Sequence, residues 1–228
     1  MNRNEKLARY RHLRAINQRQ QTGALDCVSR ATRLDCARRL GLARGRTLIL
    51  DDPDEMTLVF DLVVHAGIGG RSRAIDRYAD KVRPAPGSDD ELMLTATRNA
   101  RFTIWEVERR HAIAGLHVVD AATKDTLWLI DASFEASCRP GYVCASRLIA
   151  VDDFVMSAGA FVPIDATVLM EARRSMPRRS SASSLTELVR DPQFALSLIR
   201  AAVNTGTTAS MAYGDSGEPN PLELVRAG

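Results

Sequence analysis

RFTIWEVERRHAIAGLHVVDAATKDTLWLIDASFEASCRPGYVCASRLIAVDDFVMSAGAFVPI, residues 101–164, is the stretch that decides the fold. It contains short runs of β-branched and aromatic residues, separated by turn-forming residues such as Arg139-Pro140-Gly141. Runs of this length with turn signals between them predict a small, strongly bent antiparallel sheet or an SH3-like barrel. The predicted strands cover residues 101–109, 115–121, 126–131, 142–151 and 153–162.

Several of these predicted strands are apolar on both faces. Leu127 and Leu129 alternate with Trp128 and Ile130, so neither face of that strand is polar. A sheet with two apolar faces needs a cover on each of them. We therefore expect the flanking helices, or a second subunit, to cover the β module, and we expect one integrated domain.

Helical patterns lie on both sides of the β module. Two helices are predicted over 4–20 and 24–41, with a break at Thr22-Gly23, and Thr47 to Leu50 reads as a short edge strand. N-terminal capping patterns start at Asp52, Ser88, Asp165, Ser184 and Asp191. The helices expected from these signals cover 53–66, 71–82, 88–100 and 165–175, with two more after Ser184 and Asp191. The fold class is therefore α+β: N-terminal helices, a small bent antiparallel (SH3-like) barrel or sheet, and C-terminal helices.

Three segments follow from composition. Residues 1–46 form a basic helical segment, residues 47–204 form the α+β domain with its β module at about 101–164, and residues 205–228 are a Gly-, Ser-, Thr- and Pro-rich tail expected to be disordered. The sequence contains no apolar run long enough to span a membrane and no N-terminal apolar segment of a signal peptide. We expect a cytoplasmic protein without a membrane partner.

Charge is distributed unevenly along the chain. Residues 1–46 hold twelve Lys or Arg against three Asp or Glu, a net charge of +9, and the rest of the chain carries −6, which gives the total of +3. A basic segment on an acidic body can bind phosphate groups, but it can equally dock onto that body or onto a twin subunit. If the segment binds nucleic acid, the candidate residues are Arg30, Arg33, Arg38, Arg39, Arg44 and Arg46.

Part of the basic segment is similar to a helix-turn-helix, a motif that binds DNA. Leu34 to Leu50 resembles the middle of that motif. The would-be recognition helix, however, reads Thr47 to Pro53, which is too β-like, too apolar and too acidic for a DNA groove. The sequence therefore disfavours a helix-turn-helix at this position.

Motifs of known enzyme classes are incomplete. Gly214 to Pro219 resembles the nucleophile motif of trypsin-like serine proteases, but no base with the matching context accompanies Ser216. Val63 to Gly70 resembles part of a dinucleotide-binding turn, yet the third glycine is missing and no βαβ pattern surrounds it. Neither motif predicts an activity.

Metal and acid–base sites are also incomplete. The cysteines, at 27, 36, 138 and 144, have no zinc-ligand spacing, and we expect reduced thiols. Acids cluster at Asp51 to Glu55, where helix capping explains them, and Glu106 with Glu108 reads as a solvated strand face. The remaining pairs that could serve an enzyme are Asp61 with His65 and Glu108 with His111. No catalytic residue, metal or cofactor is assigned.

A series of short motifs runs through residues 41–165: Gly45-Arg46-Thr47-Leu48, Asp54-Glu55-Met56, Phe60-Asp61, Gly70 to Tyr78, Ala100 to Trp105, Gly115 to Asp120 and the closing strand pair from Gly141 to Gly159. In these motifs the chain resembles a group of uncharacterised proteobacterial proteins. The β part is also similar to small β modules that accompany SEC-C zinc motifs, without their clustered Cys and His ligands. The resemblance implies one folding unit and no activity. The excess of Arg over Lys is associated with GC-rich bacterial genomes.

The leading hypothesis from the sequence is a non-enzymatic binding or assembly protein that forms a homodimer or binds another protein. It depends on the two-faced strands and on the absence of a complete catalytic set. The alternatives are nucleic-acid binding through the basic N-terminal helices and an enzyme whose site forms from residues distant in the sequence.

Overall fold

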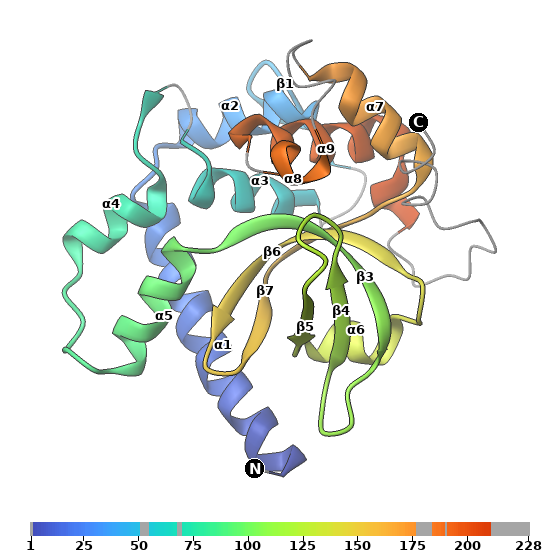
Figure 1. Ribbon diagram of the computed structural model, residues 1–228. Coiled ribbons are helices and arrows are strands. Elements are labelled where there is room, and N and C mark those ends of the chain that lie inside the picture. Colours follow the sequence, from blue (N-terminus) through green and yellow to red (C-terminus); the bar gives the residue numbers. More distant parts are fainter. Residues whose placement is uncertain (1, 51–54, 68–69, 177–183, 190, 211–228) are drawn as a thin grey trace.

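The computed structural model describes residues 2–50, 55–67, 70–176, 184–189 and 191–210 (Figure 1). Mixed helices and strands confirm the α+β class. The helices are α1 (Arg3–Asp26), α2 (Arg30–Leu40), α3 (Glu55–His65), α4 (Ala74–Lys81), α5 (Asp89–Arg98), α6 (Ala132–Ser137), α7 (Ala166–Ser175), α8 (Leu185–Leu188), α9 (Pro192–Thr205) and the 3₁₀ turn η2 (Thr207–Ser210). The strands are β1 (Ala43–Arg44), β2 (Thr47–Leu48), β3 (Arg101–Arg110), β4 (Leu116–Asp120), β5 (Thr126–Leu129), β6 (Val143–Val151) and β7 (Phe154–Pro163).

The β module is a closed five-stranded barrel. Its strands match the predicted ones to within two residues at each end, and their order around the barrel is β3-β4-β5-β7-β6. β5 and β7 are parallel, with Leu129 opposite Val155, and α6 lies between β5 and β6 in the chain. This is a Greek-key order of the OB type and differs from the SH3-like arrangement expected from the sequence.

The barrel interior is packed with large side chains. Trp105 is fully buried, its indole N–H donates to the Ser146 hydroxyl over 2.8 Å, and Phe134 of α6 packs edge-on against it at 5.3 Å. Gly115, immediately before β4, has a positive φ of 74°, and a side chain there would lie 2.1 Å from the Leu129 carbonyl oxygen. Only glycine fits that position, which sets the approach of β4 to β5.

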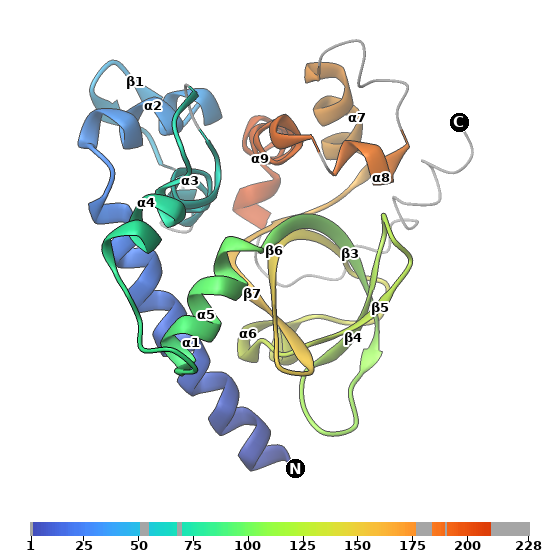
Figure 2. The ribbon, with the colours of Figure 1, turned by 60° about the vertical axis from the view of Figure 1, so that its left-hand side comes forward.

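Helices from both flanks cover the barrel, as the two-faced strands predicted. α1 and α5 lie beside β6 and β7, where Leu13 and Ile16 pack with Met93, Ile149 and other buried residues (Figure 2). A second and larger core joins α2, α3, α7 and α9 to the end of the barrel formed by residues such as Ile104, Ala145 and Val162. None of the helices that the structure describes is long and apolar enough to cross a membrane.

The predicted helix break at Thr22-Gly23 is wrong, because α1 continues to Asp26. A side chain at Gly23 would lie 2.3 Å from Cε2 of Tyr78, so this glycine permits close packing against α4 instead of ending the helix. The break comes four residues later, and the Ser29 hydroxyl, which accepts from the backbone N–H of Thr32, caps α2.

The other boundaries of helices and segments differ less from the predicted ones. The capping residues Asp52 to Asp54 lie outside the described residues, and α3 is described from Glu55. The helix expected over 71–82 starts only at Ala74. The chain does not become disordered at 205: η2 follows, and the buried Thr208 donates to Glu55 Oε1 over 3.2 Å. Residues 211–228 lie outside the described part of the chain.

Candidate functional site

The first half of the basic segment, α1, is docked onto the body of the protein. Four of its basic side chains reach carboxylates outside the helix: Arg3 pairs with Glu135 (2.7 Å), Lys6 with Asp153 (2.6 Å), Arg9 with Asp89 (2.6 Å) and Asp152 (2.9 Å), and Arg19 with Asp90 (2.5 Å). Arg14 donates to the Ser157 carbonyl. Most of the basic side chains of α1 therefore dock onto the body, which is one of the possibilities left open by the sequence.

Lys6 is the most buried of these cations. Its side chain is almost fully buried, and its ammonium lies 4.8 Å from the ring centre of Trp128 and 5.5 Å from that of Phe154. Hydrogen bonds from Lys6 and Arg9 lower the pKa of Asp153 and Asp89, respectively. These carboxylates therefore stay ionised at neutral pH and hold α1 in place.

The second half of the basic segment is different. Five arginines on α2 and the β1–β2 hairpin are exposed to solvent and form what we call the arginine surface: Arg30, Arg38, Arg39, Arg44 and Arg46. Asp35 takes up part of this charge, at 3.0 Å from Arg39 and 4.0 Å from Arg38. Arg30, Arg44 and Arg46 have no ion pair with any residue in the described ranges.

Arg33, the sixth arginine of the predicted set, turns inward. Its Nη2 donates to the Leu25 carbonyl over 2.7 Å, and its Nε is buried without a partner. This side chain ties α2 to the end of α1, so it belongs to the structure of the segment and not to the arginine surface.

The hairpin at the end of α2 displays two of the free arginines. Ala43 pairs with Leu48 and Arg44 with Thr47, which leaves Gly45 and Arg46 as a two-residue turn. Leu48 at the end of the second strand and Ile49 just after it are 42% and 44% exposed. The edge strand expected at Thr47 to Leu50 is therefore present over Thr47 and Leu48, in a hairpin apart from the barrel.

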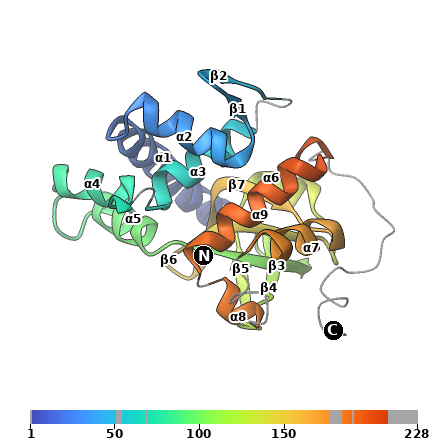
Figure 3. The same ribbon diagram turned by 90° about the horizontal axis from the view of Figure 1, so that it is seen from above.

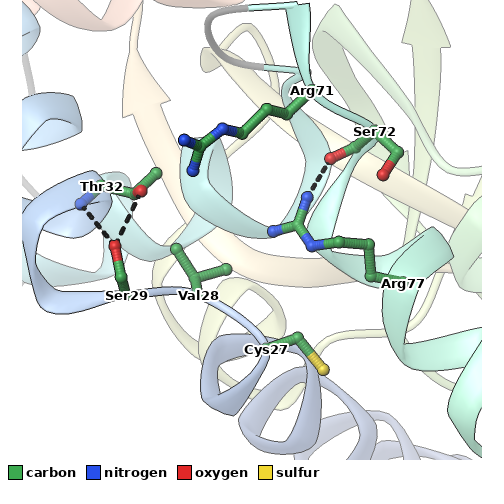
Figure 4. Close-up of a pocket in the computed structure, with 7 residues that line it drawn as sticks. All are labelled: Cys27, Val28, Ser29, Thr32, Arg71, Ser72 and Arg77. Atoms are coloured by element: carbon green, nitrogen blue, oxygen red, sulfur yellow. Dashed lines mark hydrogen bonds between the residues drawn. The ribbon is translucent and has the colours of Figure 1, made fainter.

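Two further arginines face the N-terminal end of α2. A pocket of about 330 Å³ lies beside this end. Figure 4 shows Arg71 and Arg77 extending into the same space, opposite Ser29 and Thr32. Guanidinium groups and the backbone N–H groups of a helix N-terminus both favour anions. Positive charge therefore continues from the arginine surface around this end of α2. Sequence reasoning missed both arginines because they lie about forty residues further along the chain.

Asp61 and His65, the first candidate enzyme pair, belong to the protein core. Burial opposes ionisation of Asp61, but Arg147 outweighs it and lowers the pKa of this carboxyl through two hydrogen bonds of 2.9 and 3.0 Å. His65 is buried with neither ring nitrogen hydrogen-bonded, and burial together with Arg147 lowers its pKa to about 3. A neutral imidazole without an oriented partner does not form an acid–base pair with Asp61.

Glu108 and His111 are not paired either. The His111 ring stacks on Trp128 at 4.0 Å, and its Nδ1 accepts from the backbone N–H of Ile113 over 3.1 Å. Burial, then the neighbouring His117, lowers the pKa of His111. The Glu108 carboxylate lies instead 3.9 Å from Arg109.

The part of the chain that the structure describes contains neither a metal-binding cluster nor a reactive cysteine. That part holds no group of three His, Cys, Asp or Glu residues arranged for a metal ion. The four cysteines are unpaired, and burial raises the pKa of Cys36 to about 11 and that of Cys138 to about 12. Thiols of this kind are poor nucleophiles. Of the sequence motifs, Val63 to His65 are helical and residues 214–219 lie outside the described ranges.

Comparison with known proteins identifies a family but no activity. The chain matches the model of a family of unknown function (DUF7986) over residues 4–184 and belongs to that family. The match includes α1 from its second residue, α2, the hairpin and the whole barrel. No curated protein and no solved structure is significantly similar to the chain.

Proposed function

We propose that this member of a family of unknown function is a non-enzymatic binding protein that binds nucleic acid through its arginine surface. One observation carries the proposal: four of the six Lys and Arg side chains of α1 pair with carboxylates of the body, whereas Arg30, Arg44 and Arg46 on α2 and the hairpin have no ion pair among the described residues. A guanidinium group binds phosphate oxygens with two parallel hydrogen bonds, so exposed arginines without ion pairs on α2 and the hairpin suit the sugar-phosphate backbone of a nucleic acid.

The surface is concentrated enough for this role. α2 has eleven residues, so it is about 16 Å long, and arginines lie at both of its ends. Arg71 and Arg77 add positive charge at the N-terminal end, and the hairpin adds Arg44 and Arg46 at the other. A cationic surface of that length spans several successive phosphates of one strand, because each strand of a DNA duplex carries one negative charge per about 3.4 Å of helix axis.

The barrel type alone would suggest a different surface. OB-type barrels bind oligonucleotides on the face of their second and third strands, here β4 and β5. In this protein, Trp128 on β5 is already occupied, by the His111 ring and by the Lys6 ammonium of α1. Fold-level analogy therefore supports nucleic acid as a ligand class, while the unpaired charges favour α2 and the hairpin as the surface.

A protein partner fits the arginine surface less well than a nucleic acid. A homodimer formed through the arginine surface would place like charges together, which disfavours it at this surface. Leu48 and Ile49 are nevertheless exposed beside the arginines, and a protein partner that buries them would need acidic groups around its own apolar contact. A nucleic-acid ligand agrees with the cytoplasmic location expected from the sequence.

The test is binding of labelled DNA and RNA at about 50 mM and about 200 mM salt, with two triple variants. R30A/R44A/R46A removes the unpaired arginines of the surface. R11A/R109A/R110A removes the same number of charges from exposed positions on α1 and β3 and serves as the control. We expect the wild type to bind with a steep salt dependence, and the first variant to flatten the slope of log K against log salt by about 2 to 3.

Two results would contradict the proposal. One is the absence of binding to any nucleic acid at low salt. The other is an equal loss in both triple variants, which would show that net charge, and not this surface, sets the affinity.

A further inference from the structure

We infer that the tip of the β1–β2 hairpin enters the minor groove of double-stranded DNA, with Arg44 and Arg46 as the inserted side chains. The inference rests on the proposed function and adds to it the class of nucleic acid and the element that enters the groove. Its support is the shape of the tip, the way α2 fixes it, and the free state of its two guanidinium groups.

The tip is narrow and stands clear of the rest of the protein. Gly45 takes the first central position of the turn with a φ of +57°, as in the hairpin turns that require glycine there. A side chain added at Gly45 would meet no atom within 4 Å. Figure 3 shows the hairpin projecting at the edge of the molecule, beside α2.

Arg38 fixes the tip from behind. Its Nε and Nη2 both donate to the Gly45 carbonyl oxygen, at 2.9 and 2.8 Å. At the open end of the hairpin, the Ile49 N–H donates to the Leu42 carbonyl over 2.9 Å. A tip held in one conformation loses less conformational freedom when it binds, so its arginines are preorganised for a groove.

The two arginines at the tip have no competing partner among the described residues. Asp35, the carboxylate that pairs with Arg38 and Arg39, makes no ion pair with Arg44 or Arg46. Both side chains are exposed, and one residue separates them. The guanidinium groups of Arg44 and Arg46 can therefore extend together from the narrow tip of the hairpin.

These dimensions favour the minor groove of B-form DNA. That groove is about 6 Å wide, too narrow for a helix such as α2 but accessible to arginine side chains from a turn. Its negative potential is strongest where it narrows, in A-tracts. The minor groove of A-form RNA is wide and shallow, and single strands have no groove, so neither offers the same fit.

The experiment compares four labelled probes with the full-length protein. Two are DNA duplexes of about two helical turns, one with a central A-tract and one of mixed sequence; the others are a DNA single strand and an RNA duplex. The test variant R44K/R46K keeps the charge but replaces the guanidinium groups, and R30K/R39K is the matched control on α2. Circular dichroism and thermal melting establish that both variants are folded.

We expect the wild type to bind the A-tract duplex at least about fivefold more tightly than the mixed duplex. R44K/R46K should lose most of this preference, and R30K/R39K should retain it. Equal binding of the two DNA duplexes, a preference for RNA or single-stranded DNA, or an equal loss in both variants would overturn the inference while leaving the proposed function in place. Absence of binding to all four probes would overturn the proposed function as well.

Discussion

The two halves of the basic N-terminal segment have similar compositions and different surroundings. Lys6 and Arg9 of α1 contact carboxylates on the β6–β7 loop, and Arg9 and Arg19 contact the start of α5. Arg44 and Arg46 of the hairpin contact no carboxylate in the described ranges. The comparison teaches that a run of basic residues has no single role: a charge that finds an acid on its own protein stabilises the fold, and a charge that finds none is available to a ligand.

The largest difference between the two halves should appear in stability. Leu13 of α1 is fully buried between α5 and the barrel, while Leu48 of the hairpin is 42% exposed. We expect Leu13→Ala to lower the free energy of unfolding by about 2–5 kcal/mol and Leu48→Ala by less than about 0.5 kcal/mol. Urea unfolding of both variants measures this, and similar losses would show that the hairpin is as integral to the fold as α1.

Acid pH should sharpen the comparison by separating core titration from α1 docking. The pKa of His65 is about 3 in the folded protein and about 6.5 in the unfolded chain, so between these values only the unfolded chain takes up a proton. Stability should therefore fall as the pH drops below about 6.5, by roughly 2.7 kcal/mol at about pH 4.5, which is two pH units below the unfolded value.

The variant His65→Leu should remove most of this pH dependence. The ion pairs of α1 should contribute little to it, because the pKa values of Asp89 and Asp153 are already lowered and these carboxylates stay ionised in that range. Denaturant unfolding at several pH values gives the measurement. An unchanged profile in His65→Leu would assign the loss to other groups, and α1 docking would be the first to consider.

Two single arginine variants compare the halves directly. Arg9 is partly buried and pairs with both Asp89 and Asp152, so Arg9→Ala should cost about 0.5–1 kcal/mol of stability. Arg46 has no such partner, and Arg46→Ala should leave the melting temperature unchanged while it weakens DNA binding. The account would be wrong if Arg46→Ala destabilised the protein as much as Arg9→Ala.

The smallest expected effect is a gain of affinity. Asp35 partly neutralises Arg38 and Arg39, so Asp35→Asn should tighten nucleic-acid binding by about two- to fivefold. Asp90→Asn makes the same change of net charge next to Arg19 of α1 and should have no comparable effect. Parallel titrations of the two variants at one salt concentration decide between a local and a global effect of charge.

Local patterns in the sequence predicted much of this fold. The five barrel strands and the helix start at Ser88 follow from alternation and capping, which act between neighbouring residues. The parallel pairing of β5 with β7 was not predicted, because nothing local in either strand specifies a partner so far away in the chain. The helix break predicted at Gly23 was wrong for a similar reason, because the role of this glycine depends on its contact with Tyr78 of α4.

The candidate site was only partly predictable. Sequence reasoning selected six arginines, and five of them form the arginine surface, but it had no means to see that Arg33 turns toward the Leu25 carbonyl. It also passed over Arg71 and Arg77, which reach the end of α2 through tertiary packing. Composition shows that a segment is basic, and the acids of the folded body decide which of its charges stay free.

Hydrogen–deuterium exchange with and without a DNA duplex tests the central claim most directly. The account predicts slower exchange over residues 38–49 when DNA is bound, and no change in α1, whose charges already hold it on the body. Slower exchange confined to α1, or no change in either half at a DNA concentration that saturates binding, would contradict it.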